Sequence, residues 1–190
     1  MTQSVLISIR PKWCELIASG KKTIEVRKTR PKLEPPFKCY IYCTKSTDHP
    51  RGWLGCYDHD MHKFGLISTL NIEAGKHMNI EVVSGKVIGE FVCDEIVRYA
   101  RFGYVNVPAR YMKASPGGYP ATEIHFFDLQ LSPAELDDYG EGAPLYGWHI
   151  SDLKIYDEPK ELKQFQIPTT IPARRVRQAP QSWCYIEEVE

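Results

Sequence analysis

Short strand-like segments, separated by glycine and proline, are the feature that most limits the fold of this chain. Residues 85–100, GKVIGEFVCDEIVRYA, give the clearest pattern, and Gly89 is a place where such a long strand can bend or bulge. Further strand-like segments occur at 4–9, 22–28, 38–45 and 181–189, and 147–162 starts with a strand or turn and continues as a strand. No strand–helix–strand repeat is present, which argues against a doubly wound parallel sheet. The sequence therefore predicts an α+β fold: a small, mostly antiparallel β-barrel with short helices at its mouth.

The two predicted helices carry recognisable start and stop residues. In PKWCELIAS (11–19) a proline suits the first turn, apolar residues recur at i, i+3 and i+4, and Gly20 follows as the C-terminal cap. In SPAELDDYG (132–140) Ser132 is the expected N-cap and Glu135 completes a capping box. Both helices are short, so strands must supply most of the core.

The length of the chain suits one domain. It has 190 residues, of which 43% are apolar, enough for a core of its own. Two stretches lack clear periodicity, residues 46–84 and residues 101–131. We interpret both as insertions or long loops within a single domain covering residues 1–190, and such loops are often functional or mobile.

Nothing in the sequence resembles a targeting or membrane segment. The first residues, MTQSVLISIRPKW, hold only a short apolar run before charged residues, and no apolar stretch approaches the length of a membrane span. The six cysteines form no Cys-x-x-Cys pair, so we expect free and mostly buried thiols. These features predict a cytoplasmic protein without a membrane partner.

Charge is unevenly distributed along the chain. The formal net charge is zero, which excludes a uniformly basic coat for nucleic acid. Residues 10–38, however, hold nine lysines and arginines against three glutamates. A local excess of this kind suits a surface that faces phosphates, and the alternative is a solvated face whose charges have no ligand.

One motif within this basic region is more specific than charge. Gly20-x-Lys22-x-x-Glu25-x-Arg27, directly after the first helix, resembles the G-x-K-x-x-E-x-R motif of the ASCH family (activating signal cointegrator homology), within the PUA-like superfamily. YGWHIS (146–151) and PQSWCYIEE (180–188) also resemble the C-terminal part of bacterial and phage ASCH proteins. The resemblance extends over three segments in the family's order: residues 3–45, 85–100 and 145–188. It implies a PUA-like β-barrel with a cleft, and ligands that are RNA or related to nucleotides.

The motif residues are the first candidates for a site. We expect Lys22 to contact a phosphate or a base, although an exposed lysine at a strand start is an equal alternative. Glu25 and Arg27 lie on one strand face and can pair, so the carboxylate can accept from a base, activate a water or merely fasten the fold. Strict alternation places Lys22 on the other face, so it must reach in from the turn after Gly20, or the strand must bulge.

The C-terminal segments add further candidates. Trp148 could stack on a base, although a large aromatic side chain more often fills the core. His149 could bind a ligand or act as an acid or base near neutral pH, and Ser182 could add a hydrogen bond. The run Arg174, Arg175 and Arg177 is either a loop that contacts backbone phosphates or a solvated linker.

No metal or cofactor is predicted. CYDHDMHK (56–63) contains His59-x-x-His62, whose spacing could bind a metal, but it matches no standard zinc pattern and a polar surface loop is favoured.

Three functions remain open from the sequence. The preferred one is binding of single-stranded RNA or a modified nucleotide, through Gly20, Lys22, Glu25, Arg27, Trp148 and Ser182. The second is a hydrolase in the same cleft, acting on RNA or on an acylated nucleoside with Lys22, Glu25 and His149 as catalytic residues. One branch of the superfamily resembles amidohydrolases of N4-acetylcytidine, but Glu25 occupies the position of their threonine nucleophile, so that mechanism does not transfer. The third is a protein-interaction module that uses the two long loops.

Overall fold

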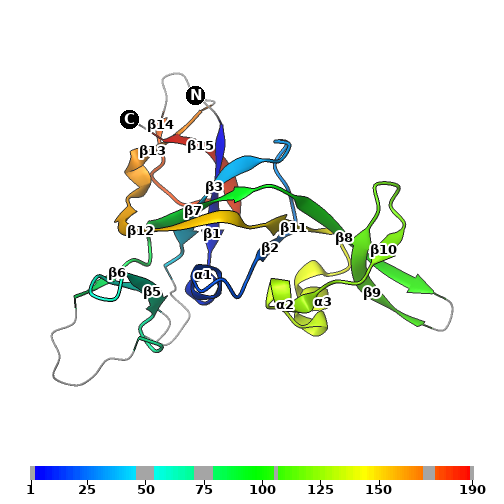
Figure 1. Cartoon of the computed structure of the whole chain (residues 1–190). Helices are drawn as coiled ribbons and strands as arrows, with labels where there is room; N and C mark the ends of the chain where they lie inside the picture. The colour runs from blue at the N-terminus through cyan, green and yellow to red at the C-terminus, as the bar shows by residue number, and fades with distance from the viewer. Residues whose placement is uncertain (1–2, 46–53, 71–78, 105–106, 169–173, 189–190) are drawn as a thin grey trace. The chain divides into compact units, whose positions relative to one another are not determined.

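Figure 1 shows a computed structural model of the whole chain. Residues 3–45, 54–70, 79–104, 107–168 and 174–188 are described here. The chain divides into two compact units, each built from separate stretches of sequence. Unit 1 contains Met1–Ser19, Lys38–Phe91 and Asp152–Glu190, and unit 2 contains Gly20–Phe37 and Val92–Ser151.

The main element of unit 1 is a seven-stranded sheet with the order β12-β7-β3-β1-β15-β13-β14. Strand β1 lies in its middle, parallel to β3 and antiparallel to β15, and all six of its residues are buried. Side chains such as Leu6, Phe165 and Ile186 pack together on the sheet. The strands are β1 (Ser4–Ile9), β3 (Phe37–Cys43), β7 (Val87–Cys93), β12 (Ser151–Lys160), β13 (Phe165–Ile167), β14 (Arg174–Arg175) and β15 (Trp183–Glu188).

Helix α1 (Pro11–Ala18) follows β1 directly, as the sequence predicts. A proline lies at its first turn, where a missing N–H costs nothing. Its buried residues include Cys14 and Ile17, which lie on one face. The helix ends at Ala18. The backbone N–H of Ser19, its C-cap, donates to the carbonyl of Glu15, and Gly20 follows with a φ of +72°.

A second, three-stranded sheet of unit 1 occupies part of the predicted 46–84 insertion. Its strands are β4 (Gly55–Asp58), β5 (Lys63–Leu66) and β6 (Ile80–Val82), with β4 in the middle. All four residues of β4 are buried. The described part of unit 1 also contains a short 3-10 helix, η2 (Leu162–Gln164).

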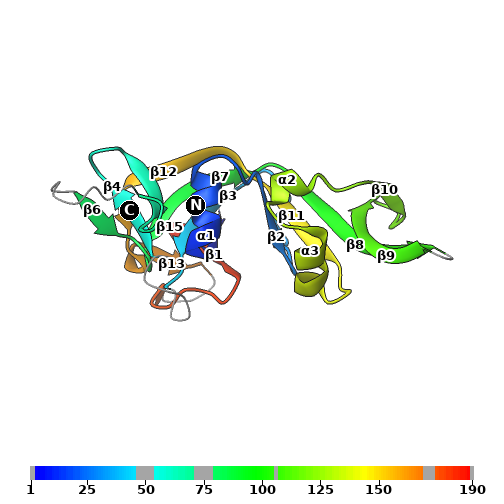
Figure 2. The ribbon, with the colours of Figure 1, turned by 90° about the horizontal axis from the view of Figure 1, so that it is seen from below.

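Unit 2 contains a five-stranded antiparallel sheet with the order β10-β9-β8-β11-β2. The strands are β2 (Ile24–Arg27), β8 (Ile96–Tyr104), β9 (Val107–Ala114), β10 (Pro120–Thr122) and β11 (Leu145–His149). Helices α2 (Phe126–Leu129) and α3 (Pro133–Gly140) lie against one face of this sheet, as Figure 2 shows from below. Val26, Tyr99 and Leu145 of the sheet pack there with Leu129 and Leu136 of the helices.

Helix α3 confirms the predicted capping box. The hydroxyl of Ser132 accepts from the backbone N–H of Glu135 at 3.2 Å, and the Glu135 carboxylate accepts from the backbone N–H of Ser132 at 2.8 Å. The side chains of Ser132 and Glu135 thereby satisfy two backbone donors that would otherwise lack partners.

The predicted α+β class is confirmed, with strands predominating over short helices. The described strands form three sheets with free ends, and within them no closed barrel is present, so the barrel itself was predicted wrongly. Residues 101–131 are also more regular than expected, because β8, β9, β10 and α2 occupy most of them. The segment 85–100 is two strands rather than one, since pairing stops at Asp94 and Glu95.

Candidate functional site

The motif residues Lys22, Glu25 and Arg27 come together at the edge strand of the unit 2 sheet. The Lys22 Nζ lies 3.6 Å from Glu25 Oε2, and Arg27 Nη2 lies 3.1 Å from Glu25 Oε1. Lys22 also donates a hydrogen bond of 2.5 Å to the backbone carbonyl of Leu129 in α2. Because β2 begins at Ile24, strand alternation does not constrain Lys22, which reaches the carboxylate from the turn after Gly20.

These charged side chains are almost completely buried. Lys22 is 3% exposed and Glu25 is 6% exposed. Burial lowers the pKa of Lys22, and the attraction of Glu25 acts in the opposite direction without cancelling it. A buried lysine, glutamate and arginine carry one net positive charge, which is costly unless each has a partner, as here.

The register of the sheet decides which neighbours share a face with this cluster. Glu25 pairs with Trp148, and Arg27 pairs with Tyr146 of β11. Tyr146 in turn pairs with Arg98 of β8. Paired residues of antiparallel strands point to the same face, so Arg27, Tyr146 and Arg98 form a row across three strands. We call this the arginine–tyrosine row.

The arginine–tyrosine row lies on the face opposite α2 and α3. Those helices pack with Val97 and Tyr99, the odd-numbered residues of β8, whereas Arg98 has the opposite orientation. Arg98 is exposed, and Tyr146 is half-buried. Neither residue was predicted from the sequence, since their approach to Arg27 depends on strand pairing between segments far apart in the chain.

Trp148 lies on the same face as Glu25 but is fully buried. The Phe37 ring packs edge-on against it, with ring centroids 6.0 Å apart. It is therefore a core side chain in this structure, and its stacking on a base stays a prediction that would require a rearrangement.

His149 is not part of the Lys22–Glu25–Arg27 cluster. It pairs with Ile24, which places it on the other face of the sheet. Its Nδ1 lies 2.7 Å from Asp94 Oδ1, and its side chain is 40% exposed. The hydrogen bond with His149 lowers the pKa of Asp94, although burial acts in the opposite direction. The structure thus supplies an Asp–His pair that the sequence analysis did not identify.

Ser182 belongs to unit 1, in the turn before β15. Its backbone carbonyl accepts a hydrogen bond of 2.9 Å from the backbone N–H of Ser8. The backbone of Ser182 therefore helps to hold the fold of unit 1. Contact between Ser182 and a ligand stays a prediction.

The histidines of the CYDHDMHK segment point to carboxylates, in unit 1. His59 Nε2 lies 3.3 Å from Glu81 Oε2, and His62 Nδ1 lies 3.6 Å from Asp157 Oδ1. Among the residues described, no group of three metal-binding side chains comes together. All six cysteines are free thiols and five of them are buried, as predicted.

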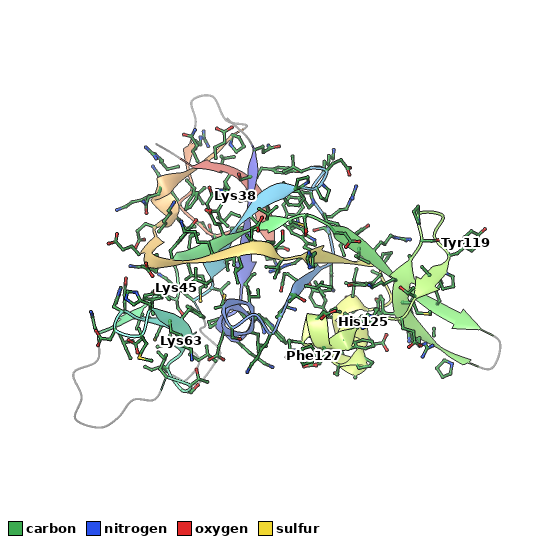
Figure 3. All side chains as sticks on the ribbon, viewed as in Figure 1. Lys38, Lys45, Lys63, Tyr119, His125 and Phe127 are labelled. Atoms are coloured by element: carbon green, nitrogen blue, oxygen red, sulfur yellow. The ribbon has the colours of Figure 1, made fainter. Side chains whose placement is uncertain are left out.

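Two exposed aromatic side chains of unit 2 were also missed. Tyr119, in the turn before β10, is 75% exposed, and Phe127 of α2 is 77% exposed (Figure 3). Exposed aromatic rings can stack on bases, but a sequence pattern cannot distinguish them from core aromatics.

Comparison with known proteins identifies the family. The ASCH domain matches residues 7–156, and the chain therefore belongs to the ASCH family. The fold is similar to the crystal structure of the ASCH protein from Zymomonas mobilis, with a TM-score of 0.52 and 20% identity, covering 98% of both chains. A mutant of that protein gives the same TM-score at 19% identity, covering 97% of this chain and 90% of the other.

No curated protein sequence matched the chain. Within the described residues, no helix has the length and apolar character needed to span a membrane.

Proposed function

We propose that the protein binds single-stranded RNA or a modified nucleotide on the unit 2 face that carries the arginine–tyrosine row. The observation that supports this is the placement of Tyr146 between Arg27 and Arg98 on neighbouring strands. An aromatic ring flanked by guanidinium groups offers a base a stacking surface and offers phosphates bidentate hydrogen bonds. Membership of the ASCH family, within a superfamily that includes RNA readers, is consistent with it.

Lys22 and Glu25, which are both buried, act on the ligand through Arg27. Glu25 binds the Arg27 guanidinium at 3.1 Å, and Lys22 lies 3.6 Å from the same carboxylate on its other oxygen. We infer that Lys22 and Glu25 hold Arg27, whose side chain is only 11% exposed, at one end of the row. Tyr146 and the exposed Arg98 then make the main contacts with the ligand. Gly20 permits the turn that brings Lys22 to the cluster, because its φ of +72° is unfavourable for other residues.

Fluorescence anisotropy with a labelled single-stranded RNA tests this site. We expect Tyr146→Ala to weaken binding by about 1 kcal/mol or more, through lost stacking. Arg98→Ala should also reduce the slope of log K against log salt by about 0.7, the value for one phosphate contact on a single strand.

Arg101→Ala is the matched control, since Arg101 is an arginine of the same strand on the opposite face, 3.6 Å from Asp137 of α3. Equal affinities for Arg98→Ala, Tyr146→Ala and Arg101→Ala would place any RNA contact elsewhere and refute the proposed site.

A hydrolase is the second candidate, and the His149–Asp94 pair favours it. A histidine that bonds a carboxylate through Nδ1 keeps Nε2 available for proton transfer, and its side chain is 40% exposed. The substrate would be RNA or an N4-acylated cytidine. Because His149 lies on the face opposite Glu25, this activity would not use the Lys22–Glu25–Arg27 cluster as first expected.

Mass spectrometry separates the two candidates. The purified protein is incubated with short single-stranded RNA and with acylated cytidines, and His149→Ala serves as the comparison. Products that appear with the wild type and disappear with His149→Ala would establish an enzyme. Unchanged substrates, together with RNA binding that needs Tyr146, would establish a binding protein.

A further inference from the structure

Two adjoining cavities in unit 1 lie along the segment 176–180. Their volumes are about 780 Å³ and about 700 Å³. Both are lined by Val176, Arg177, Gln178 and Pro180. We refer to the two together as the unit 1 groove.

The residues lining the unit 1 groove are strongly basic. The cationic ones are Lys45, Lys163, Arg174, Arg175 and Arg177. The acidic one is Glu161, whose Oε1 already lies 3.5 Å from the Lys86 Nζ. Five cations against one acid, in a chain with no net charge, give the groove a positive local charge that favours an anionic ligand.

Three hydrogen bonds to backbone carbonyls hold the walls of the unit 1 groove. The Val176 N–H donates to the carbonyl of Phe165 at 2.8 Å, beside the β13–β14 pair. The Ser8 hydroxyl donates to the carbonyl of Pro180 at 2.6 Å. Arg175 Nη1 donates to the carbonyl of Lys163 at 3.3 Å, which holds one guanidinium at the rim. Cationic side chains on a segment that hydrogen bonds already hold in place lose less conformational entropy when they bind an anion than those on a flexible segment.

Size and lining together indicate the class of ligand. Volumes of about 700 to 780 Å³ fall in the range of small-molecule sites and exceed what inorganic phosphate needs. Ile167, Val176 and Pro180 supply apolar surface, and Tyr42 and Thr44 supply hydroxyl groups. Arginine binds phosphate oxygens in a bidentate fashion.

We propose that the unit 1 groove is a second ligand site, which binds a nucleoside phosphate, either free or at the end of an RNA strand. It uses no residue of the arginine–tyrosine row, so it does not depend on the function proposed for unit 2. It also gives a role to the Arg174–Arg177 run, for which the sequence left a solvated linker as the alternative.

The test measures binding of three probes: inorganic phosphate, uridine monophosphate and a labelled octauridylate. The variants are Arg177→Glu and Lys45→Glu (Lys45 is labelled in Figure 3), and Lys154→Glu is the control. Lys154 is an exposed lysine of β12 in the same unit and is absent from the residues that line either cavity. Circular dichroism confirms that each variant is folded.

We expect Arg177→Glu and Lys45→Glu each to weaken uridine monophosphate binding about tenfold or more, since charge reversal replaces attraction with repulsion. Lys154→Glu should bind it as the wild type does. Tight binding of the octauridylate without the mononucleotide, lost in Arg177→Glu, would identify the strand as the source of the phosphate.

Other results overturn the inference. One such result is that Arg177→Glu and Lys45→Glu bind both nucleotide probes as tightly as the wild type does. Another is that the wild-type protein binds inorganic phosphate but neither nucleotide probe. If these two variants bind normally while Tyr146→Ala does not, the unit 1 groove fails and the unit 2 site stands. The reverse pattern would retain the unit 1 groove and reject the unit 2 site.

Discussion

The Lys22 ammonium group lies between the carbonyl of Leu129 and the carboxylate of Glu25, almost without contact with solvent. The motif spacing predicted that Lys22, Glu25 and Arg27 belong together, and their geometry agrees. Their burial was not predictable, because alternation within a strand of four residues does not show what covers each face. Arg98 and Tyr146 were missed for a related reason, since cross-strand neighbours depend on register.

Burial of Lys22 predicts a stability that depends on pH. Its pKa in the folded protein is below the ordinary value of 10.5. At a pH between the lowered pKa of the folded protein and the ordinary pKa of the unfolded chain, the unfolded chain binds more protons than the folded one. The free energy of unfolding therefore rises with pH in this range. We expect the stability of the wild type relative to Lys22→Met to increase as the pH approaches 10.5.

Urea unfolding from pH 7 upward measures this difference, with Lys28→Met as the control on an exposed lysine 3.0 Å from Glu141. A difference between wild type and Lys22→Met that stays constant over the whole range would contradict the assignment.

Glu25 is the counter-ion of two buried cations, and its loss should be costly. Removing one partner of a buried ion pair leaves an uncompensated charge, with a typical cost of about 3 kcal/mol. We expect Glu25→Gln to lower the free energy of unfolding by about this amount, measured by urea denaturation at neutral pH. Glu34→Gln, at an exposed pair with Arg30, should change it by less than about 0.5 kcal/mol. Equal effects of the two variants would show that the buried pair has no special energetic role.

At the scale of elements, the strand periodicities located most strands, and start and stop residues located α1 and α3. The errors occurred where long-range packing decides the outcome. Residues 85–100 read as one strand, yet β7 ends at Cys93 and β8 begins at Ile96. Residues 101–131 lack a regular pattern, yet β8 and β9 pair through most of their length. Pairing with a neighbouring strand compensates for weak local preference, and a single sequence does not show the neighbour.

Gly147 of β11 illustrates packing that links three strands. A Cβ atom there would lie 2.6 Å from the Tyr99 ring and 2.9 Å from Ile24 Cγ2. Both neighbours are buried, so Gly147→Ala forces the core to move, and we expect a loss of about 1 to 3 kcal/mol in thermal or urea unfolding. Gly117→Ala, where the nearest atom is 3.4 Å away on the exposed Tyr119, is the control. A Gly147→Ala variant as stable as the wild type would show that this part of unit 2 repacks freely.

At the scale of the whole molecule, the sequence suggested one domain with insertions, and the structure gives two compact units built from interleaved segments. Apolar periodicity shows which face of a strand is buried but not which strand pairs with it. That limit explains why separate sheets were not distinguished from a closed barrel. Whether residues 46–84 and 101–131 are insertions relative to other family members stays a prediction.

The sheet of unit 1 should depend on β15, which lies between β1 and β13. A chain that ends at Gln181 lacks this strand, so we expect the amides of β1 to lose protection against hydrogen exchange, because half of their neighbours are gone. A chain that ends at Glu188 is the control, and β11 of unit 2 provides an internal reference within each sample. Undiminished protection of β1 in the shorter chain would contradict this dependence.

The pairing of β1 with β15 also sets an order of events during protein synthesis. Of the strands described, β1 leaves the ribosome first and β15 last, although the two lie side by side in the finished sheet. The strands of unit 2 are all translated by His149, well before β15. While the C-terminal strands are still being made, β1 therefore presents an unpaired edge that β15 will later cover, and a chaperone that binds extended apolar segments would find it there.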